Sequence, residues 1–304
     1  GTRSGQVSRF DEEGAVKWRH HCIFRAERPF WPWWFLETPL VGALAVGRDP
    51  VGERDLLAVG TGSTSLNFLE ASTGQLLKDV VSPYGLPDRI QAYLSASSGG
   101  LQFLVGHSWL SCGSSVRAWS PPPQAGEGVS YQRSVDPMGR TVDGWDCCGV
   151  VDFWVGPLIR GMPDRVVVLR HGAVNQITVY DEATGDPLWD AGLGGAPVAL
   201  AVVGGGDSAA TRICVAEQFG WFVEFDGNGR RVWATHVAGS LRGMNAIPDG
   251  DLVLWNREGL YIPGPDQDTD RYRLEGDPLG WYAHPQYAGL LCIEKEHLVL
   301  GCRD

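Results

Sequence analysis

The sequence is poor in long hydrophobic runs, in helical periodicity and in basic residues. No stretch of about 18 consecutive apolar residues occurs, which argues against a transmembrane helix. Lys and Arg number 25 against 36 Asp and Glu, and the net charge of −11 lacks the basic excess of a general nucleic-acid binder. No apolar repeat with the helical period of about 3.6 residues stands out. These absences favour a globular protein made of strands, with neither a membrane span nor a nucleic-acid partner.

The sequence signatures of several catalytic and metal sites are missing as well. There is no GxSxG elbow for a Ser-His-Asp triad and no GxxxxGK[ST] phosphate loop. No HExxH pair occurs, and the seven cysteines do not form paired CxxC knuckles, so we predict no metal site. Cys147 and Cys148 are adjacent in the sequence. None of these patterns assigns a cofactor.

Glycine is abundant, with 41 residues, and it recurs inside one repeated pattern. The pattern is a hydrophobic strand, an acidic residue, a glycine turn and a second strand that often carries tryptophan. Asp and Gly tolerate the positive φ of a short hairpin, so each copy predicts two antiparallel strands joined by a tight turn. The four copies are Phe10-Asp11-Glu12-Glu13-Gly14 with Trp18, Leu69-Glu70-Ala71-Ser72-Thr73-Gly74 with Lys78 in the tryptophan position, Tyr180-Asp181-Glu182-Ala183-Thr184-Gly185 with Trp189, and Phe225-Asp226-Gly227-Asn228-Gly229 with Trp233.

The spacing of these turns predicts an all-β fold, a β-propeller of six four-stranded blades. Blades of such repeats run about 40–50 residues. About one, two and one blade lengths separate the turn glycines Gly14, Gly74, Gly185 and Gly229 in turn. About two blade lengths separate Gly229 from Gly14 when the two ends of the chain are joined. Two weaker hairpins fill the double intervals, the first at 116–119 with 129–131 and the second at 260–262 with 272–274.

The two ends of the chain complete this prediction. Residues 298–304 read as a second strand with the start of a turn, and residues 5–10 read as the third strand that should follow. Pairing these strands in one blade would remove the exposed sheet edges of an open array. We therefore expect a single propeller domain over residues 1–304, with one tryptophan-rich insertion at about 19–38.

With its acidic residue, glycine turn and tryptophan, the repeated pattern resembles that of the quinoprotein-like (PQQ-like repeat) β-propellers. The resemblance covers most of the chain through the four copies. It implies a propeller, but it does not imply one activity, because that family includes dehydrogenases, assembly scaffolds and polysaccharide-cleaving enzymes.

The expected topology places most histidines on one face of the propeller, the top face. This face carries the turns between second and third strands and the connections between blades, whereas the glycine hairpins lie on the opposite face. Polar residues prefer loops for solvation alone, which would explain any single histidine. Loop ends on a rigid scaffold are also common binding positions, so we predict that the top face binds the ligand. The histidines assigned to it are His20, His21, His107, His171, His236 and His284, with His297 opposite; Thr61, Cys147, Cys148, Arg170, Phe219, Arg242, Arg257, Trp281, Tyr282 and Arg303 share the top face.

The predicted insertion at 19–38 is locally basic and is the most aromatic stretch of the chain. It contains Arg25, Trp33 and Trp34. Aromatic planes beside Arg and His suit stacking on sugar rings and pairing with carboxylate or sulfate groups. The alternative is a loop that covers the edge of a blade with its tryptophans buried.

Three functions remain open. The first is a binding propeller whose top face recognises an anionic ligand, an acidic glycan above all, or a protein partner. The second is a lyase for uronate-containing polysaccharides, which needs a cation for the carboxylate, a base and an acid. The third is a quinone-cofactor dehydrogenase, which the resemblance and the adjacent Cys147 and Cys148 suggest, although such enzymes have more blades than this chain can hold. The residues assigned to ligand binding are Arg170, Arg257, His20, His21, Arg25, Trp33, Trp34, His236 and Trp281, and those assigned to lyase catalysis are His107, His171, Tyr282 and His284.

The partner is therefore expected to be an acidic polysaccharide or a protein. We expect a monomer in an extracellular or periplasmic location. No signal peptide is recognisable in the residues that follow Gly1.

Overall fold

The computed structural model of the chain consists of strands and turns, with no helix among the described residues. The all-β prediction is confirmed over this part of the chain. Beyond Pro263 the structure describes the backbone alone. The described residues are 1–23, 40–62, 65–81, 86–108, 114–121, 126–131, 148–159, 161–172, 174–204, 211–237, 239–246, 252–257, 259–263, 269–273, 277–284, 287–294 and 297–302.

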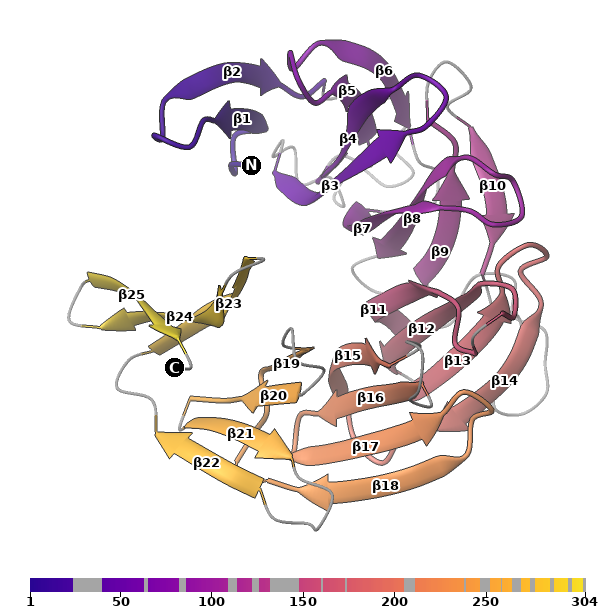
Figure 1. The fold of residues 1–304 in the computed structure, drawn as a ribbon, viewed down its shortest axis with the longest axis vertical. Coiled ribbons are helices and arrows are strands. Elements are labelled where there is room, and N and C mark those ends of the chain that lie inside the picture. Colours follow the sequence, from indigo (N-terminus) through magenta and orange to yellow (C-terminus); the bar gives the residue numbers. More distant parts are fainter. Residues whose placement is uncertain are drawn as a thin grey trace, which may run out of the picture. The chain divides into compact units, whose positions relative to one another are not determined.

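Five four-stranded antiparallel sheets make up most of the described chain (Figure 1). In each of them the strands pair in chain order, so one continuous segment makes one sheet, as predicted for a blade. The sheets are β3 (Val41–Asp49), β4 (Arg54–Thr61), β5 (Ser65–Glu70) and β6 (Leu76–Val81); β7 (Leu86–Leu94), β8 (Leu101–Ser108), β9 (Ser114–Trp119) and β10 (Glu127–Ser130); β11 (Cys148–Gly156), β12 (Arg165–Gly172), β13 (Gln176–Asp181) and β14 (Pro187–Gly192); β15 (Pro197–Val203), β16 (Arg212–Glu217), β17 (Trp221–Asp226) and β18 (Arg231–His236); and β19 (Gly243–Ala246), β20 (Leu252–Trp255), β21 (Gly259–Pro263) and β22 (Thr269–Arg273).

Smaller sheets form at the two ends of the sequence, and the predicted closure is not confirmed. β1 (Gln6–Phe10) pairs with β2 (Val16–His21), whereas β23 (Asp277–His284), β24 (Tyr287–Glu294) and β25 (His297–Cys302) form a three-stranded sheet. No pairing joins β1 to β25 among the described strands. The count of six blades is not confirmed either, because these end strands form two separate sheets. The two weaker hairpins are confirmed as β9–β10 and β21–β22.

Contacts divide the chain into two compact units, each described by itself. Unit 1 comprises Gly1–Val150, Pro163–Val166 and Tyr180–Leu188, and unit 2 comprises Val151–Met162, Val167–Val179 and Trp189–Asp304.

The core of unit 1 joins the sheets β3–β6 and β7–β10. Phe68 of β5 and Phe103 of β8 are both fully buried, and their ring centroids lie 5.6 Å apart. The strands approach so closely that Gly47 of β3 has no room for a side chain, because a Cβ there would lie 2.6 Å from Leu101. Alternate residues of β3 are exposed, as expected for a strand with one packed face.

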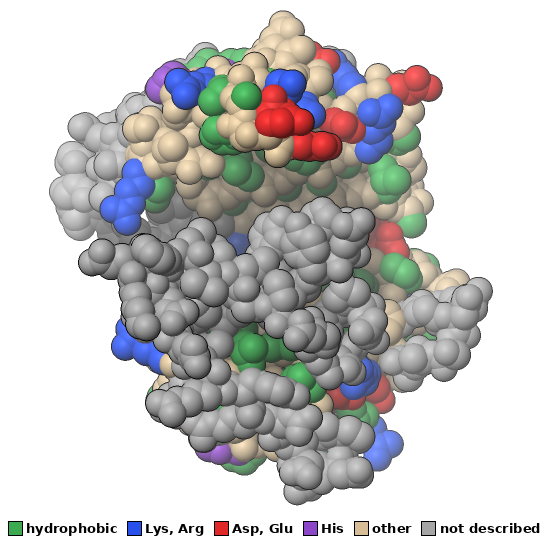
Figure 2. Space-filling model, turned by 60° about the vertical axis from the view of Figure 1, so that its left-hand side comes forward, with side chains coloured by type: hydrophobic (Ala, Val, Ile, Leu, Met, Phe, Trp, Pro, Cys, Tyr) green, Lys and Arg blue, Asp and Glu red, His purple; other side chains and the backbone are tan. Residues whose placement is uncertain are grey.

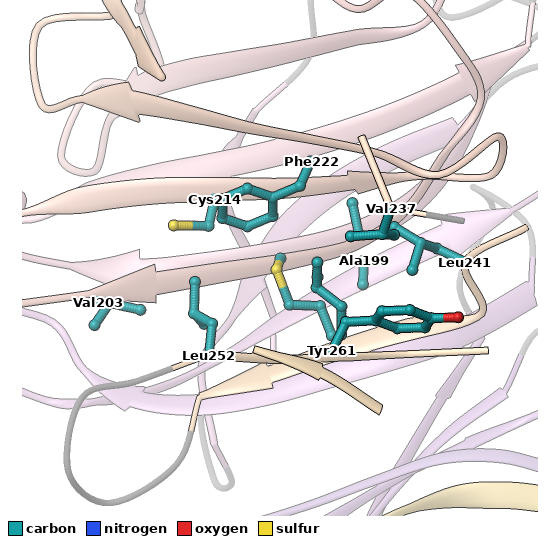
Figure 3. Packing of buried hydrophobic residues seen from close by; sticks show 11 residues of the cluster. Ala199, Val203, Cys214, Phe222, Val237, Leu241, Leu252 and Tyr261 are labelled. Atoms are coloured by element: carbon teal, nitrogen blue, oxygen red, sulfur yellow. The ribbon is translucent and has the colours of Figure 1, made fainter. Parts of the chain in front are cut away.

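The core of unit 2 joins the sheets β15–β18 and β19–β22 (Figure 3). Cys214 and Phe222 come from the first sheet, and Leu252 and Tyr261 come from the second. Each such apolar side chain contributes about 1.5–3 kcal/mol when it is fully removed from water. Cys214 is a buried free thiol, and it packs as a small hydrophobic residue.

The turn glycines of the repeated pattern adopt the backbone conformation that the sequence predicts. Their φ angles are 83° at Gly14, 74° at Gly74, 77° at Gly185 and 84° at Gly229. Side chains with a Cβ rarely adopt this region, which explains why glycine occupies the same position in all four copies.

The tryptophan of the pattern packs against the next sheet along the chain. In unit 1, Trp18 Nε1 donates a hydrogen bond of 3.1 Å to the Ala71 carbonyl. In unit 2, Trp189 Nε1 donates one of 3.3 Å to the Gly227 carbonyl. The repeated residues thus build both the hairpin within each sheet and a contact between successive sheets.

Candidate functional site

Two large aromatic side chains are exposed at one end of the sheet β15–β18. Phe219 lies in the turn between β16 and β17 and is 65% exposed, and Trp221 begins β17 and is 44% exposed. His236 is the last residue of β18, pairs with Trp221 across the strands and is also exposed. These three residues are referred to below as the aromatic–histidine patch. Isolated exposed hydrophobic residues are ordinary. Two large aromatics on one turn, with a histidine of the neighbouring strand beside them, are a candidate binding surface.

The turn that carries the patch is fixed by its backbone. The amide of Gly220 donates to the Glu217 carbonyl at 3.1 Å, and the amide of Val237 donates to the Gly220 carbonyl at 2.9 Å. Gly220 has a φ of 90°, and a Cβ there would lie only 2.3 Å from the Val237 carbonyl oxygen. Only glycine satisfies this geometry, so the sequence Phe-Gly-Trp holds two aromatic rings on a tight turn.

His236 is held on the patch through both a hydrogen bond and a ring contact. Its Nε2 lies 2.9 Å from the Phe219 carbonyl oxygen, and its ring meets Trp221 edge to face with centroids 5.1 Å apart. Because a carbonyl oxygen can only accept, the hydrogen resides on Nε2. Nδ1 is therefore the ring nitrogen that His236 offers to a ligand.

A buried carboxylate lies next to the patch. Glu217 ends β16 and is only 2% exposed. Burial raises the pKa of the Glu217 carboxyl, and hydrogen bonds from the amides of Gly194 and Gly195, with the charge of Arg231, partly offset this effect. Its Oε2 has no hydrogen-bond partner among the described residues. A buried anion with one unsatisfied oxygen is a costly feature, which marks this end of the sheet as a candidate site.

The neighbouring sheet of unit 2 extends the site toward His171. The Nδ1 of this exposed histidine lies 2.8 Å from the Asn175 side-chain oxygen, in the turn between β12 and β13. The amide of Leu193, which follows β14, donates to the Asn175 carbonyl at 2.9 Å. The next two residues, Gly194 and Gly195, donate backbone hydrogen bonds to the Glu217 carboxylate. The predicted residues His171 and His236 therefore belong to one chain of contacts within unit 2.

Two predicted site residues are buried in strands, which corrects their assignment to exposed loop ends. Arg170 is 1% exposed within β12, and His107 is fully buried within β8 beside Trp119. Both strands continue past the positions at which a turn was expected, β12 as far as Gly172. Their backbone pairs in the sheet, so these side chains take part in packing.

Three further residues lie in a strand and not in the predicted connection between blades. Trp281, Tyr282 and His284 belong to β23, where His284 pairs with Tyr287 of β24. His284 is therefore the last residue of the first strand of its sheet, which in a propeller is the end opposite to the predicted one. Their side chains lie outside the described part of the structure, so their predicted roles stay predictions.

The remaining predicted residues lie at strand ends, in one turn, or outside the described residues. His20 and His21 end β2, and His21 Nε2 lies 3.1 Å from Gln6 Nε2. Burial lowers the pKa of His20, with a smaller effect from His21. Arg257 is exposed in the turn after β20. Arg25, Trp33, Trp34, Cys147 and Arg303 lie outside the described residues, and Cys148 begins β11.

Trp221 and Glu217 were missed by reasoning from the sequence. The signal that could have found Trp221 is the run Phe219-Gly220-Trp221, in which two aromatics flank a turn glycine. No group of three or more His, Cys, Asp or Glu side chains in the described part of the chain is arranged to hold a metal ion. Nor do the described residues include a helix that could cross a membrane.

No family model matches the sequence, and no curated protein matches it. Solved structures do match. A structure of BBS1N in complex with ARL6DN is 12% identical with a TM-score of 0.62, and the match covers 83% of this chain and 76% of that chain. The WD40 β-propeller domain of Doa1 is 11% identical with a TM-score of 0.59, and the match covers 95% of this chain and 83% of that one. At such low identity these matches show the fold alone, which is a β-propeller.

Proposed function

We propose that this chain is a binding β-propeller that recognises a protein partner through the aromatic–histidine patch. The observation that carries the proposal is the exposure of Phe219 and Trp221 on a turn whose backbone is fixed by Gly220. Aromatic side chains of this size supply much of the binding energy at protein interfaces. A turn that is already ordered loses little entropy when it binds.

A protein of the same fold supports the proposal that the partner is a protein. BBS1N is in complex with ARL6DN, so a propeller with a TM-score of 0.62 to this chain takes part in a protein assembly. Fold likeness alone does not transfer the partner. The patch on this chain supplies the local argument, because its rings are too exposed to serve the core.

An acidic glycan remains the second candidate ligand. The exposed Arg257 favours it, because a guanidinium can donate hydrogen bonds to a carboxylate or sulfate. The burial of Arg170 removes one of the cations on which this hypothesis relied. Figure 2 shows acidic and basic side chains interspersed on the described part of the face that it presents. The protein-binding hypothesis therefore has the stronger support.

The catalytic alternatives have less support from the described residues. A lyase needs an acid and a base converging on one sugar, and His107 is buried whereas His171 is exposed. A quinone-cofactor dehydrogenase depended on Cys147 and Cys148, of which the first lies outside the described residues. Neither hypothesis accounts for the exposed Phe219 and Trp221.

The proposal is tested by binding of the whole chain to two panels of immobilised probes, one of random-sequence peptides and one of acidic oligosaccharides such as heparin and polygalacturonate fragments. We expect peptide ligands whose binding weakens about tenfold or more in Phe219→Ala and Trp221→Ala, since aromatic hot spots contribute at least about 2 kcal/mol. Any polygalacturonate that binds is also followed for ultraviolet absorbance of unsaturated uronate, which a lyase would produce.

One variant provides a matched control. Phe10 is 56% exposed at the end of β1, so Phe10→Ala removes a similar ring from another part of the surface. The proposal requires that Phe10→Ala binds as the unmodified chain does. Peptide binding that is unaffected by Phe219→Ala and Trp221→Ala would overturn it, and so would binding of acidic oligosaccharides alone.

A further inference from the structure

We infer that the aromatic–histidine patch binds a basic segment of its protein partner, with a Lys or Arg side chain of the partner over Trp221 and the buried Glu217 carboxylate as its counter-charge. The inference rests on the proposed function and adds the chemistry of the partner. It depends on how Glu217 is placed, on which ring faces lie beside it, and on the charge of the chain.

Glu217 differs from the other buried carboxylate of its sheet. Glu224 of β17 is also buried, but Arg212 approaches it at 3.5 Å and supplies a positive charge. Glu217 receives hydrogen bonds from the amides of Gly194 and Gly195 and is influenced by the charge of Arg231, but none of the ion pairs among the described residues includes Glu217. Buried charges in proteins are usually paired. A partner's cation would complete this pair.

The carboxylate and an exposed ring lie beside the same glycine. A Cβ on Gly195 would lie 2.8 Å from Glu217 Oε2 and 3.6 Å from Phe219 Cδ2. The negative charge is thus next to the patch, and the carboxylate itself is shielded from water because Glu217 is only 2% exposed. The attraction of a cation to such a buried charge is stronger than the attraction between two charges in bulk water. A cation held over the patch would interact with both the ring faces and the carboxylate.

Trp221 offers the ring that suits a cation best. A Lys ammonium or Arg guanidinium over the face of a tryptophan is attracted by the ring quadrupole. His236 meets Trp221 edge to face, which fixes the indole while leaving 44% of the residue exposed. The net charge of −11 would attract a basic partner over a longer distance and would repel an acidic one.

The test compares two synthetic peptides that differ only in charge. One contains arginines separated by glycines, and the other has citrulline, a neutral isostere, in place of each arginine. Binding to the full chain is measured by calorimetry at physiological salt. We expect the arginine peptide to bind about tenfold more tightly. Trp221→Ala and Glu217→Gln should each remove most of this difference, whereas Trp221→Phe should keep part of it.

Controls separate the patch from general attraction to an acidic protein. Asp190→Asn removes an exposed negative charge from β14, outside the patch, and should leave the ratio between the two peptides unchanged. Phe10→Ala should do the same. An equal effect of Asp190→Asn and Glu217→Gln would mean that the peptide binds by net charge alone, and the inference would be wrong.

The outcomes also separate this inference from the proposed function. If both peptides bind equally and both depend on Trp221, the patch binds partners but not through a cation, so the inference fails and the proposed function stands. If a glutamate-containing peptide binds more tightly than the arginine peptide, the inference fails in favour of an anionic ligand. If no peptide depends on Trp221, both proposals fail.

Discussion

Trp189 lies directly against Gly229 of the following sheet in unit 2: a Cβ on Gly229 would fall 2.6 Å from the indole Cδ2. The same relationship recurs in unit 1, where a Cβ on Gly74 would fall 2.5 Å from Trp18 Cδ2. In both places the glycine serves two purposes, since it allows the positive φ of its own hairpin and makes room for the tryptophan of the preceding repeat. The repeated sequence pattern therefore reflects contacts between successive sheets.

This double role predicts that Gly229→Ala destabilises the chain more than Gly14→Ala. Both glycines have nearly the same φ, 84° and 83°, so the backbone strain of about 1–2 kcal/mol is shared. Only Gly229 faces a tryptophan, whereas a Cβ on Gly14 would meet nothing within 4 Å. Overpacking adds about 1–3 kcal/mol to the loss at Gly229. Urea denaturation of the two variants measures the difference, and equal losses would show that the tryptophan contact contributes nothing.

A second prediction concerns the buried network around Glu182 in unit 1. Tyr131 Oη donates a hydrogen bond of 2.7 Å to the Glu182 main-chain carbonyl, and Ser95 Oγ donates one of the same length to its carboxylate. Tyr131→Phe should lower the free energy of unfolding by about 1–3 kcal/mol, because it leaves a buried carbonyl with one partner fewer. Tyr261→Phe is the control, since that hydroxyl makes a longer hydrogen bond of 3.4 Å to Asn256. A larger loss at Tyr261 than at Tyr131 would refute this account of the network.

The third prediction is the pH dependence of stability at Glu217. Burial raises the pKa of this carboxyl above its unfolded value of about 4.3, so the folded state binds the proton more tightly than the unfolded state does. The contribution of Glu217 to stability therefore falls as the pH rises from the unfolded pKa through the folded pKa. Glu217→Gln should be more stable than the unmodified chain at neutral pH, and the gain should vanish below about pH 4.

Thermal melts across this pH range measure the effect. Glu224 and Asp164 also have raised pKa values through burial, so part of the pH dependence should remain in the variant. If Glu217→Gln loses as much stability between acidic and neutral pH as the unmodified chain does, the prediction is wrong.

The fourth prediction links the backbone of the turn to binding. Gly220→Ala places a Cβ 2.3 Å from the Val237 carbonyl at a φ of 90°, so the turn must shift. Binding of any peptide that depends on Trp221 should weaken about tenfold, although all three side chains of the patch are unchanged. Gly99→Ala is the matched control, because Gly99 has a φ of 69° and open space around its Cβ position. If both variants bind equally well, the fixed turn has no role in recognition.

The hairpins could be predicted from the sequence because their signals are local. An acidic residue and a glycine at fixed spacing determine a turn, and Gly14, Gly74, Gly185 and Gly229 all adopt the positive φ that was expected. The weaker hairpins were found from their alternating strands alone, as the pairing of Leu260 with Tyr272 shows. Closure could not be determined in this way, because it depends on a contact between distant ends of the sequence.

The site was predicted only in part, and the reason is the length of the strands. His171 and His236 are exposed near the ends of β12 and β18, whereas Arg170 and His107 are buried in strands that continue past the expected turn. Consecutive residues of a strand face opposite sides of the sheet, so within β12 Arg170 is buried while the next residue, His171, is exposed. Glu217 gives no local signal at all, since its burial depends on the approach of Gly194 and Gly195.

Fluorine NMR shows whether the aromatic–histidine patch is the binding surface. One sample carries 4-fluorophenylalanine at position 219 and a second carries it at position 10, and each is titrated with the arginine peptide and its citrulline counterpart. We expect a saturable shift of the resonance at position 219 with the arginine peptide, a smaller one with the citrulline peptide, and none at position 10. Equal shifts at the two positions, or no shift at position 219, would contradict this expectation.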